Sequence, residues 1–471
     1  MKIIKTLILL YLLPTLLFSA LLYDVPVKLK QPDGSTLHCY ASGDEYYSRL
    51  HDQNDYTITQ SNEDGFYYYA LLENQTIVPS IYRADQNYNL AQLGFRKKVM
   101  IPQERYLEIR ERWWNGVETR DAPTTGTVNN LNVFIRFADE DEFGNARSYY
   151  DSYFNNENGP SMKHYFSEVS YDMLTVNTIH YPTSSMDSNL SYQDQYPRSY
   201  YQPYNAVTNP GGYTDSERTD REHTLLQNAI AFIESEVPDS LIIDSNNDGN
   251  VDNVTFLVYG VPGGWADLLW PHRWALYSVV SEIHGKRVWD YNFNMASGPY
   301  FSVGTLAHEF CHSLGAPDLY HYYNETAPVA VGGWDVMDAS TDIPQWMSSY
   351  IKYRYFNWIE LQDASGGGTF ELNPLGQPDN NAYRLDSSNP NEYFIIEYRT
   401  QEGMYDSNAP GIDSGIVIYR VNDLYNGQGN AQGPPDELYV YRVGGTSTTS
   451  GVFASAVFSE EVGRTQFNDS T

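Results

Sequence analysis

Cysteine is nearly absent from this sequence: its 471 residues contain only Cys39 and Cys311. Two cysteines cannot form the multiply cross-linked framework by which small exported proteins replace a core. The chain must instead be stabilised by burial of apolar residues, for which its length is ample. At the usual size of roughly 100–200 residues per domain, that length predicts two to four domains.

Positive charge is also in short supply, because 29 Lys and Arg face 60 Asp and Glu and the formal net charge is −31. So acidic a chain repels nucleic-acid phosphates and anionic membrane surfaces, which excludes nucleic acid as the expected partner. The acidic residues are spread over loops rich in Asn, Asp, Gly and Tyr, which is typical of a soluble protein or of one with cation sites.

Long apolar runs are missing beyond the N-terminus. The segment MKIIKTLILLYLLPTLLFSA places two lysines before a short apolar run that Pro14 interrupts, as in a signal peptide. No second apolar stretch of about 20 residues follows, so no stable membrane insertion is expected. Residues 1–20 are therefore predicted to be a signal peptide and the protein to be secreted, with association to the cell surface left open. The alternative is an uncleaved anchor.

Composition divides the remaining chain into three regions of an α+β protein. Residues 21–120 are β-rich, residues 125–362 alternate strands with helices, and residues 369–471 are again β-rich and could continue into a further domain. The expected elements are hairpins at Pro32-Asp33-Gly34 and Asp64-Gly65, helices over 102–115, 161–170, 223–237 and 346–359, a linker over 122–130, and strands over 131–138, 254–260, 369–375, 392–399 and 414–421.

The pattern His308-Glu309-Phe310-Cys311-His312 fits H-E-x-x-H. On a helix, positions four apart differ by only about 40° around the axis, so both imidazoles point the same way and can hold one Zn²⁺. Glu309 lies beside the first histidine, where it can act as general base toward a water that the zinc activates.

A catalytic zinc needs a third protein ligand, and Asp318 is the candidate. Gly315 can end the helix at positive φ, and Pro317 prevents the helix from resuming, so the chain can turn back and bring Asp318 under the metal. The alternative is that Asp318 caps local structure or binds calcium while another residue completes the zinc site.

Met337 follows a glycine pair in VGGWDVMDAS, residues 331–340. It could lie under the zinc ligands as a polarisable floor. Taken alone, such a methionine is more often ordinary core packing.

HEFCHSLGAPD followed by GGWDVMD resembles the immune inhibitor A family of secreted zinc metallopeptidases, whose pattern is H-E-x-x-H-x-x-G-x-x-D plus a methionine turn. The segments MKHYFSEVSYDMLTV, LLWPHRWAL, YFIIEYR, NAQGPPDELYVYR and GRTQFND agree with it, and LKQPDGSTLHCYASGDEYYSRLHDQNDYTI is similar to the family's propeptide. The resemblance implies a metzincin-like catalytic fold, endopeptidase activity on proteins or peptides, and synthesis as a zymogen inhibited by its own propeptide, residues 21–120. It also implies zinc ligation by His308, His312 and Asp318, with Glu309 as the base. Several metzincin relatives have a tyrosine two residues past the turn methionine, whereas Ala339 stands here, so the group that stabilises the oxyanion is open.

A second cation site is expected in DSNNDGNVD, residues 244–252, where carboxylate and amide side chains alternate around Gly249. An EF-hand would carry a bidentate glutamate at the position of Thr255, so the loop is EF-like at most. The alternative is an ordinary turn rich in Asp and Asn. The candidate ligands of this structural Ca²⁺ are Asp244, Asn246, Asp248, Asn250 and Asp252.

Removal of the propeptide is expected to require a cut within residues 96–125, where Arg96-Lys97-Lys98 and Arg120 offer basic sites. Cys311 is expected to pack as a small buried apolar residue. The alternatives are a disulfide with Cys39, or a latency switch in which Cys39 reaches the zinc.

Two other functions remain open. One is an inactive, calcium-dependent surface-binding protein on a protease scaffold, against which the intact Glu309 argues. The other is a zinc amidase or deacylase acting on small molecules or glycans. No pattern in the sequence specifies the oligomeric state.

Overall fold

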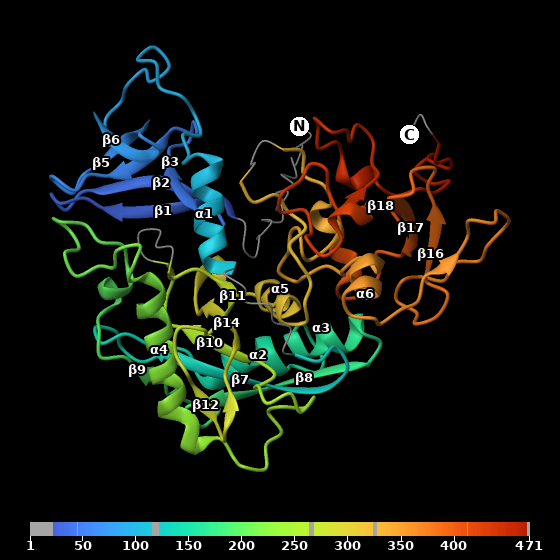
Figure 1. Ribbon diagram of the computed structural model, residues 1–471, viewed down its shortest axis with the longest axis horizontal. Helices are drawn as coiled ribbons and strands as arrows, with labels where there is room; N and C mark the ends of the chain where they lie inside the picture. Colours follow the sequence, from blue (N-terminus) through green and yellow to red (C-terminus); the bar gives the residue numbers. More distant parts are fainter. Residues whose placement is uncertain are drawn as a thin grey trace, which may run out of the picture.

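The chain forms three main sheets in a mixed α+β arrangement, which confirms the expected class. The computed structural model describes residues 22–44, 46–114, 122–262, 268–323, 327–411 and 413–468. The expected signal peptide and Arg120 lie outside these residues. The N-terminal sheet, the central sheet and the C-terminal sheet surround helix α5 (Val303–Ser313) (Figure 1).

The N-terminal sheet is a six-stranded antiparallel meander in which every strand pairs with its sequence neighbour. Two of its turns are the expected ones, with Gly34 at φ +83° and Gly65 at φ +77°, a conformation that glycine adopts without steric cost. The helix expected next is α1 (Gln103–Trp114). The strands are β1 (Leu22–Lys30), β2 (Thr36–Gly43), β3 (Ser48–His51), β4 (Thr57–Gln60), β5 (Tyr67–Glu73) and β6 (Thr76–Arg83).

The central sheet has the order β11-β14-β10-β7-β8, and β9 (Tyr192–Gln193) extends it beside β7. Its strands are β7 (Gly126–Arg136), β8 (Leu174–Tyr181), β10 (Val254–Val258), β11 (His272–Ala275) and β14 (Asp290–Met295). Four neighbouring strands of this sheet, β14, β10, β7 and β8, run parallel to one another. Strand β11 pairs antiparallel with β14 at the edge. A small hairpin, β12 (Glu282–Ile283) with β13 (Lys286–Arg287), precedes β14.

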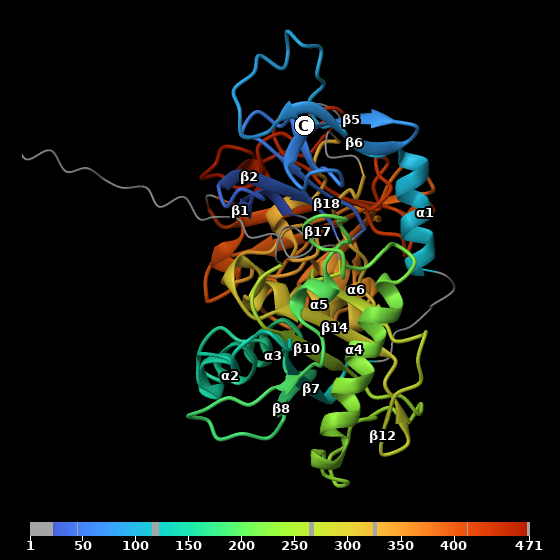
Figure 2. The same cartoon turned by 90° about the vertical axis from the view of Figure 1, so that its left-hand side faces the viewer.

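Helices cover both faces of the central sheet. Figure 2 shows α2 (Arg147–Asn155) and α3 (Met162–Val169) on one side of β7, β8 and β10, and α4 (Arg218–Ile233) on the other. Successive side chains of β10 point to opposite faces of the sheet and so contribute to a core on each face. Leu257 packs with α3 and α5, and its neighbours Phe256 and Val258 pack with α4. A strand buried on both faces accounts for the continuous apolar run in β10.

The C-terminal sheet has the order β15-β16-β17-β18-β19. Its strands are β15 (Gln362–Asp363), β16 (Ala382–Asp386), β17 (Glu392–Arg399), β18 (Gly415–Asn422) and β19 (Leu438–Val440). Ile395, Val417 and Tyr419 of this sheet belong to the same buried cluster as Phe310 of α5. The expected boundary between residues 362 and 369 therefore separates segments that share one core.

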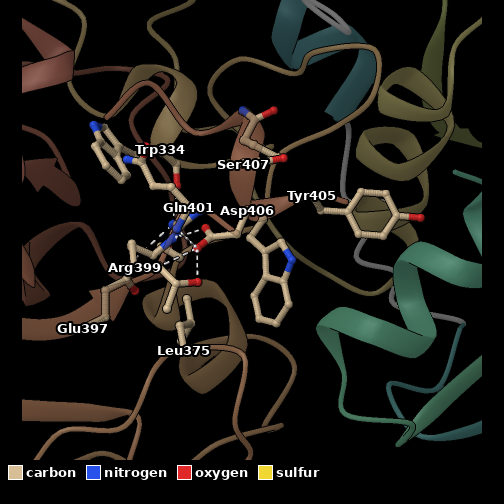
Figure 3. Close-up of polar contacts among 12 residues, drawn as sticks. Trp334, Leu375, Glu397, Arg399, Gln401, Tyr405, Asp406 and Ser407 are labelled. Atoms are coloured by element: carbon tan, nitrogen blue, oxygen red, sulfur yellow. Dashed lines mark hydrogen bonds and ion pairs between the residues drawn. The ribbon is translucent and has the colours of Figure 1, made fainter. Parts of the chain in front are cut away.

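A buried ion-pair network ties the C-terminal sheet to the segment before Met337. The guanidinium of Arg399 donates from Nε to Asp406 at 2.5 Å and from Nη1 to Glu397 at 3.1 Å (Figure 3). The same Nη1 donates to the Trp334 carbonyl at 3.3 Å. Arg399 and Glu397 are fully buried.

Three expected elements differ from the structure. Residues 126–130 are not a linker but the start of β7, where Asn130 bonds Thr178 of β8 and so satisfies a polar side chain inside the sheet. The helix expected over 346–359 is only α6 (Ser349–Arg354), which begins where the Ser348 hydroxyl accepts from the Ile351 N–H. Residues 369–375 form no strand and make a single bridge from Pro374.

The helices in the described part of the chain include none with the length and apolar character needed to cross a bilayer.

Arg399→Met should lower the free energy of unfolding by about 3–5 kcal/mol, because it leaves the buried carboxylates of Glu397 and Asp406 without their cation. Urea denaturation measures the loss. Lys163→Met is the control, since it removes only a surface pair with Glu157 that solvent and salt screen. Equal losses for both variants would contradict the assigned role of the network.

Candidate metal centre

Helix α5 carries the H-E-x-x-H pattern, and all of its residues except His312 are buried. It begins at Ser302, whose hydroxyl accepts from the Thr305 N–H. Its far end is fixed to the central sheet by side-chain amides, since Asn292 donates to the Glu309 carbonyl at 2.9 Å and to the Ser313 hydroxyl at 3.2 Å. The helix therefore has little freedom to rotate, and the directions of its side chains are set.

The chain reverses direction just after α5, as the glycine predicts. Gly315 has φ +99°, and its N–H donates to the His312 carbonyl at 2.9 Å. The Ala316 N–H donates to the Cys311 carbonyl at 2.9 Å, which closes the last turn of the helix. Asp318 follows this reversal and lies back against the helix.

His308, His312 and Asp318 converge on one point. The Asp318 Oδ1 lies 3.1 Å from Nε2 of His308 and 3.3 Å from Nε2 of His312, and the two nitrogens are 3.1 Å apart. No other group of three or more His, Cys, Asp or Glu side chains converges in this way within the described ranges. The side chains of His308 and Asp318 are 1% and 3% exposed, whereas that of His312 is 16% exposed, so the group opens toward solvent on the His312 side.

Backbone carbonyls fix the orientation of both imidazoles. Nδ1 of His308 lies 2.9 Å from the Val336 carbonyl, and Nδ1 of His312 lies 2.8 Å from the Ala316 carbonyl. A carbonyl can only accept, so Nδ1 carries the proton in each ring and Nε2 of a neutral ring presents a lone pair. Such a bond on the far nitrogen is the usual support of a metal-binding histidine.

Charge at the centre shows the same preference for a cation. Burial lowers the pKa of His312, but the Asp318 carboxylate and then Glu309 outweigh it and raise this pKa to about 9. Burial dominates for His308, whose pKa lies below its ordinary value. Burial would raise the pKa of Asp318, yet the two imidazoles hold it below its usual range.

The donor set fits Zn²⁺. Two neutral imidazole nitrogens and one carboxylate oxygen are ligands that zinc prefers, and three protein ligands leave a position open. Their three acceptor atoms would repel one another unless a cation or a proton lay among them.

The segment around Met337 supports the ligands through its backbone. The Val336 carbonyl holds His308, and the Met337 carbonyl accepts from the Leu319 N–H at 2.9 Å, next to Asp318. The Met337 side chain is fully buried in the core shared with α5. The sequence indicated the methionine. It could not indicate the Val336 carbonyl, because every residue type has a backbone carbonyl.

Glu309 is 1% exposed and lies on α5 beside His308. Its carboxylate is close enough to His312 to raise the pKa of that ring. A carboxylate buried beside the three converging ligand atoms can accept a proton from a water molecule bound among them.

The N-terminal region covers Tyr322, which contacts a metal-ligand candidate. The Tyr322 hydroxyl donates to Oδ2 of Asp318 at 2.5 Å, so that Oδ1 is left to face the histidines. The Tyr46 ring packs edge-on against Tyr322 with centroids 5.2 Å apart, and the Arg110 guanidinium lies 5.1 Å from the centroid of the Tyr322 ring. Neighbouring Tyr323 donates to the Ile101 carbonyl at 2.9 Å.

Cys39 and Cys311 are both free and buried. They lie in different clusters, Cys39 in the N-terminal sheet and Cys311 among the apolar residues around α5. The disulfide alternative is therefore wrong for this structure, and Cys39 is not a member of the converging group. Burial raises the pKa of the Cys39 thiol to about 12, so this thiol is not prepared to bind a metal as thiolate.

The candidate calcium loop is closed by its own hydrogen bonds. Oδ1 of Asp244 accepts from the Asp248 N–H at 3.0 Å, and both oxygens of Asp252 accept from the Ser245 N–H at 3.1 Å. Lys286 donates to the other oxygen of Asp244 at 2.6 Å.

Two further members of that loop, Asn246 and Asn250, lie exposed and half-buried, respectively. Burial raises the pKa of Asp252 to about 6. Lys286 already supplies a positive charge to Asp244, where a calcium ion would have to compete with it. Calcium binding at these residues stays a prediction.

Comparison with known proteins adds little. No protein-family model matches the chain, and no curated protein does. The crystal structure of wild-type OgpA from Akkermansia muciniphila aligns with 66% of this chain and 92% of that chain, at 10% sequence identity and a TM-score of 0.25. Identity and a TM-score this low do not establish a shared fold.

Zinc affinity should rise about tenfold per pH unit between pH 6.5 and 8.5, because the proton on His312, with its pKa of about 9, must leave for each ion bound. Competition with a chromophoric chelator measures this slope. Asp318→Asn should bind zinc more weakly and with a shallower slope, since the carboxylate that raises this pKa is gone. His284→Gln, on the remote β12–β13 hairpin, should behave as wild type. A flat profile for the wild type would contradict the assignment of His312 as a ligand.

Proposed function

We propose that this protein is a secreted, zinc-dependent endopeptidase with a metzincin-like catalytic region, made as a zymogen and similar to the immune inhibitor A family. The observation that carries the proposal is the convergence of three lone-pair atoms, from His308, His312 and Asp318, beside the buried carboxylate of Glu309. The parallel sheet with an antiparallel edge strand, β11, beside α5 supports it, because an extended peptide can pair with a sheet edge.

Each residue of the centre has a distinct part in this mechanism. A bound zinc would lower the pKa of a water molecule and polarise the scissile carbonyl. Glu309 takes the proton of the attacking water and returns it to the leaving amine. The imidazoles keep Nδ1 protonated toward their carbonyls throughout, so that Nε2 stays available.

The N-terminal region is proposed as the inhibitor. Tyr46 and Arg110 come from residues 21–120 and pack on Tyr322, the tyrosine that donates to Asp318. A substrate approaching from this side would have to displace them. Arg96 and Lys97 are exposed in a segment outside the helices and strands, where a trypsin-like protease can reach the chain.

The two alternative functions fit the site less well. A purely structural zinc in a surface-binding protein has no use for a base, yet Glu309 is held beside the ligands. An amidase for small molecules needs no 100-residue cover. Protein substrates are therefore the better match.

Glu309→Gln should reduce peptidase activity by about 10²–10⁴-fold and leave zinc content unchanged, because the amide keeps the shape of the side chain but cannot accept the proton. Casein or a quenched peptide, with and without a zinc chelator, provides the assay. The matched control is Glu168→Gln, a carboxylate on α3 that accepts from Trp346. If wild type and Glu309→Gln are equally inert after the N-terminal region is removed, the peptidase proposal fails.

Limited trypsin treatment that cuts within residues 96–125 should activate the protein, since the N-terminal sheet, with Tyr46 packed on Tyr322, is then held only by non-covalent contacts. Adding Tyr46→Ala should speed this gain by weakening those contacts. Gel analysis and peptide hydrolysis are followed in parallel, with cut Glu309→Gln as the inert control. An intact chain as active as the cut one would contradict the zymogen proposal.

A further inference from the structure

We propose that residues 427–430 of the C-terminal region are a positioning element for the ligand Asp318, with Asn430 as the positioning residue. This inference depends on the proposed metal centre. It assigns to the C-terminal region the task of holding the Asp318 and Leu319 carbonyls, which neither the H-E-x-x-H helix nor the methionine segment contacts by a hydrogen bond.

Asn430 holds the backbone of the ligand segment at two successive peptide groups. Its N–H donates to the Asp318 carbonyl at 2.9 Å, and its side-chain Nδ2 donates to the Leu319 carbonyl at 2.9 Å. Asn430 is fully buried, so water does not replace these bonds.

Strand β19 in turn fixes the side chain of Asn430. Its Oδ1 accepts from the Leu438 N–H at 3.0 Å, and its Nδ2 donates to the Leu438 carbonyl at 2.8 Å. The side-chain amide thus bonds both the ligand segment and the backbone of Leu438, in the way that the backbone amide of a neighbouring strand would. No other side-chain type offers a donor and an acceptor in this geometry on so short a stem.

Glu437 holds the loop that precedes Asn430. This fully buried carboxylate accepts from three N–H groups, those of Gly427 at 3.2 Å, Gln428 at 2.9 Å and Gly429 at 2.6 Å. Several donors on one buried carboxylate stabilise its charge. The loop is therefore rigid where it meets the metal centre.

Gly429 brings the two backbones into direct contact. A Cβ built on it would lie 2.0 Å from the Asp318 carbonyl oxygen and 2.9 Å from Cβ of Pro317. Only glycine fits there, so a side chain at this position must push the ligand segment away.

The ligand segment needs this support because it belongs to no helix or strand. On its other side, the Leu319 N–H donates to the Met337 carbonyl. The peptide that follows Asp318 is thus held between the methionine segment and Asn430. Mutations of residues that support metal ligands typically cost 10–100-fold in metal affinity.

Gly429→Ala and Gly427→Ala form a matched pair for the test. Both glycines have positive φ, +62° and +85°, and both donate to Glu437, but a Cβ on Gly427 meets nothing within 4 Å. Alanine therefore strains both positions, and only Gly429→Ala displaces Asp318. In the full chain, chelator competition should show zinc affinity at least tenfold weaker for Gly429→Ala and within threefold of wild type for Gly427→Ala. Equal affinities for the two variants would overturn the inference.

Should Gly429→Ala fail to fold by circular dichroism, Asn430→Ala decides. Its control is Asn422→Ala, a buried amide at the end of β18 whose Oδ1 accepts from the Leu424 N–H and whose side chain makes no hydrogen bond to the ligand segment. Weaker zinc binding by Asn430→Ala alone supports the inference, and equal binding by both overturns it. A wild type that binds no zinc would instead overturn the metal centre itself, so the two failures are distinguishable.

Discussion

The convergence of three ligand atoms on one buried point is the constraint on which the centre of this molecule depends. Two imidazole nitrogens and a carboxylate oxygen lie within about 3 Å of one another, an arrangement that is unfavourable unless a positive charge joins it. A proton on His312 supplies that charge when no metal is bound, so the fold must hold the same atoms in place with the proton or with a cation. It does so with hydrogen bonds to the far side of every ligand, from Val336, Ala316 and Tyr322.

The support comes from regions that are far apart in the sequence. Helix α5 is fixed to the central sheet by Asn292, the methionine segment is fixed to the C-terminal sheet by Arg399, and the ligand segment is fixed by Asn430. Two buried glutamates, Glu397 and Glu437, each collect donors from other parts of the chain. These polar connections surround the apolar core that the C-terminal sheet and α5 share.

The sequence predicted the local part of this site. The register of His308 and His312 on one helix, and the reversal at Gly315, follow from helix geometry and from the conformational freedom of glycine. The supporting groups could not be predicted, because a backbone carbonyl such as that of Val336 is present in every residue type. Asn430 looks like any loop asparagine until β19 is placed beside it.

The same limit explains the misassigned elements. Asn129 and Asn130 favour a loop on local grounds, yet they lie in β7 because bonds to Ile242 and Thr178 satisfy their amides. Conversely, residues 346–359 were expected to form one helix, but Ser348 starts α6 late and Asn357, at φ +56°, lies in a conformation that a helix excludes. Tertiary contacts decided the first case, and a capping bond and the backbone conformation of Asn357 decided the second.

The bond from Asn430 to the ligand segment spans 111 residues of sequence, and this has a consequence for biosynthesis. A chain emerges from the ribosome N-terminus first, so Asp318 is made long before the residue that holds it. The bonds that hold the ligand segment can form only after β19 has been synthesised. By then the N-terminal sheet and α1 have had time to fold. If residues 21–120 act as the proposed inhibitor, the order of translation therefore lets them form before the ligand segment is fully held.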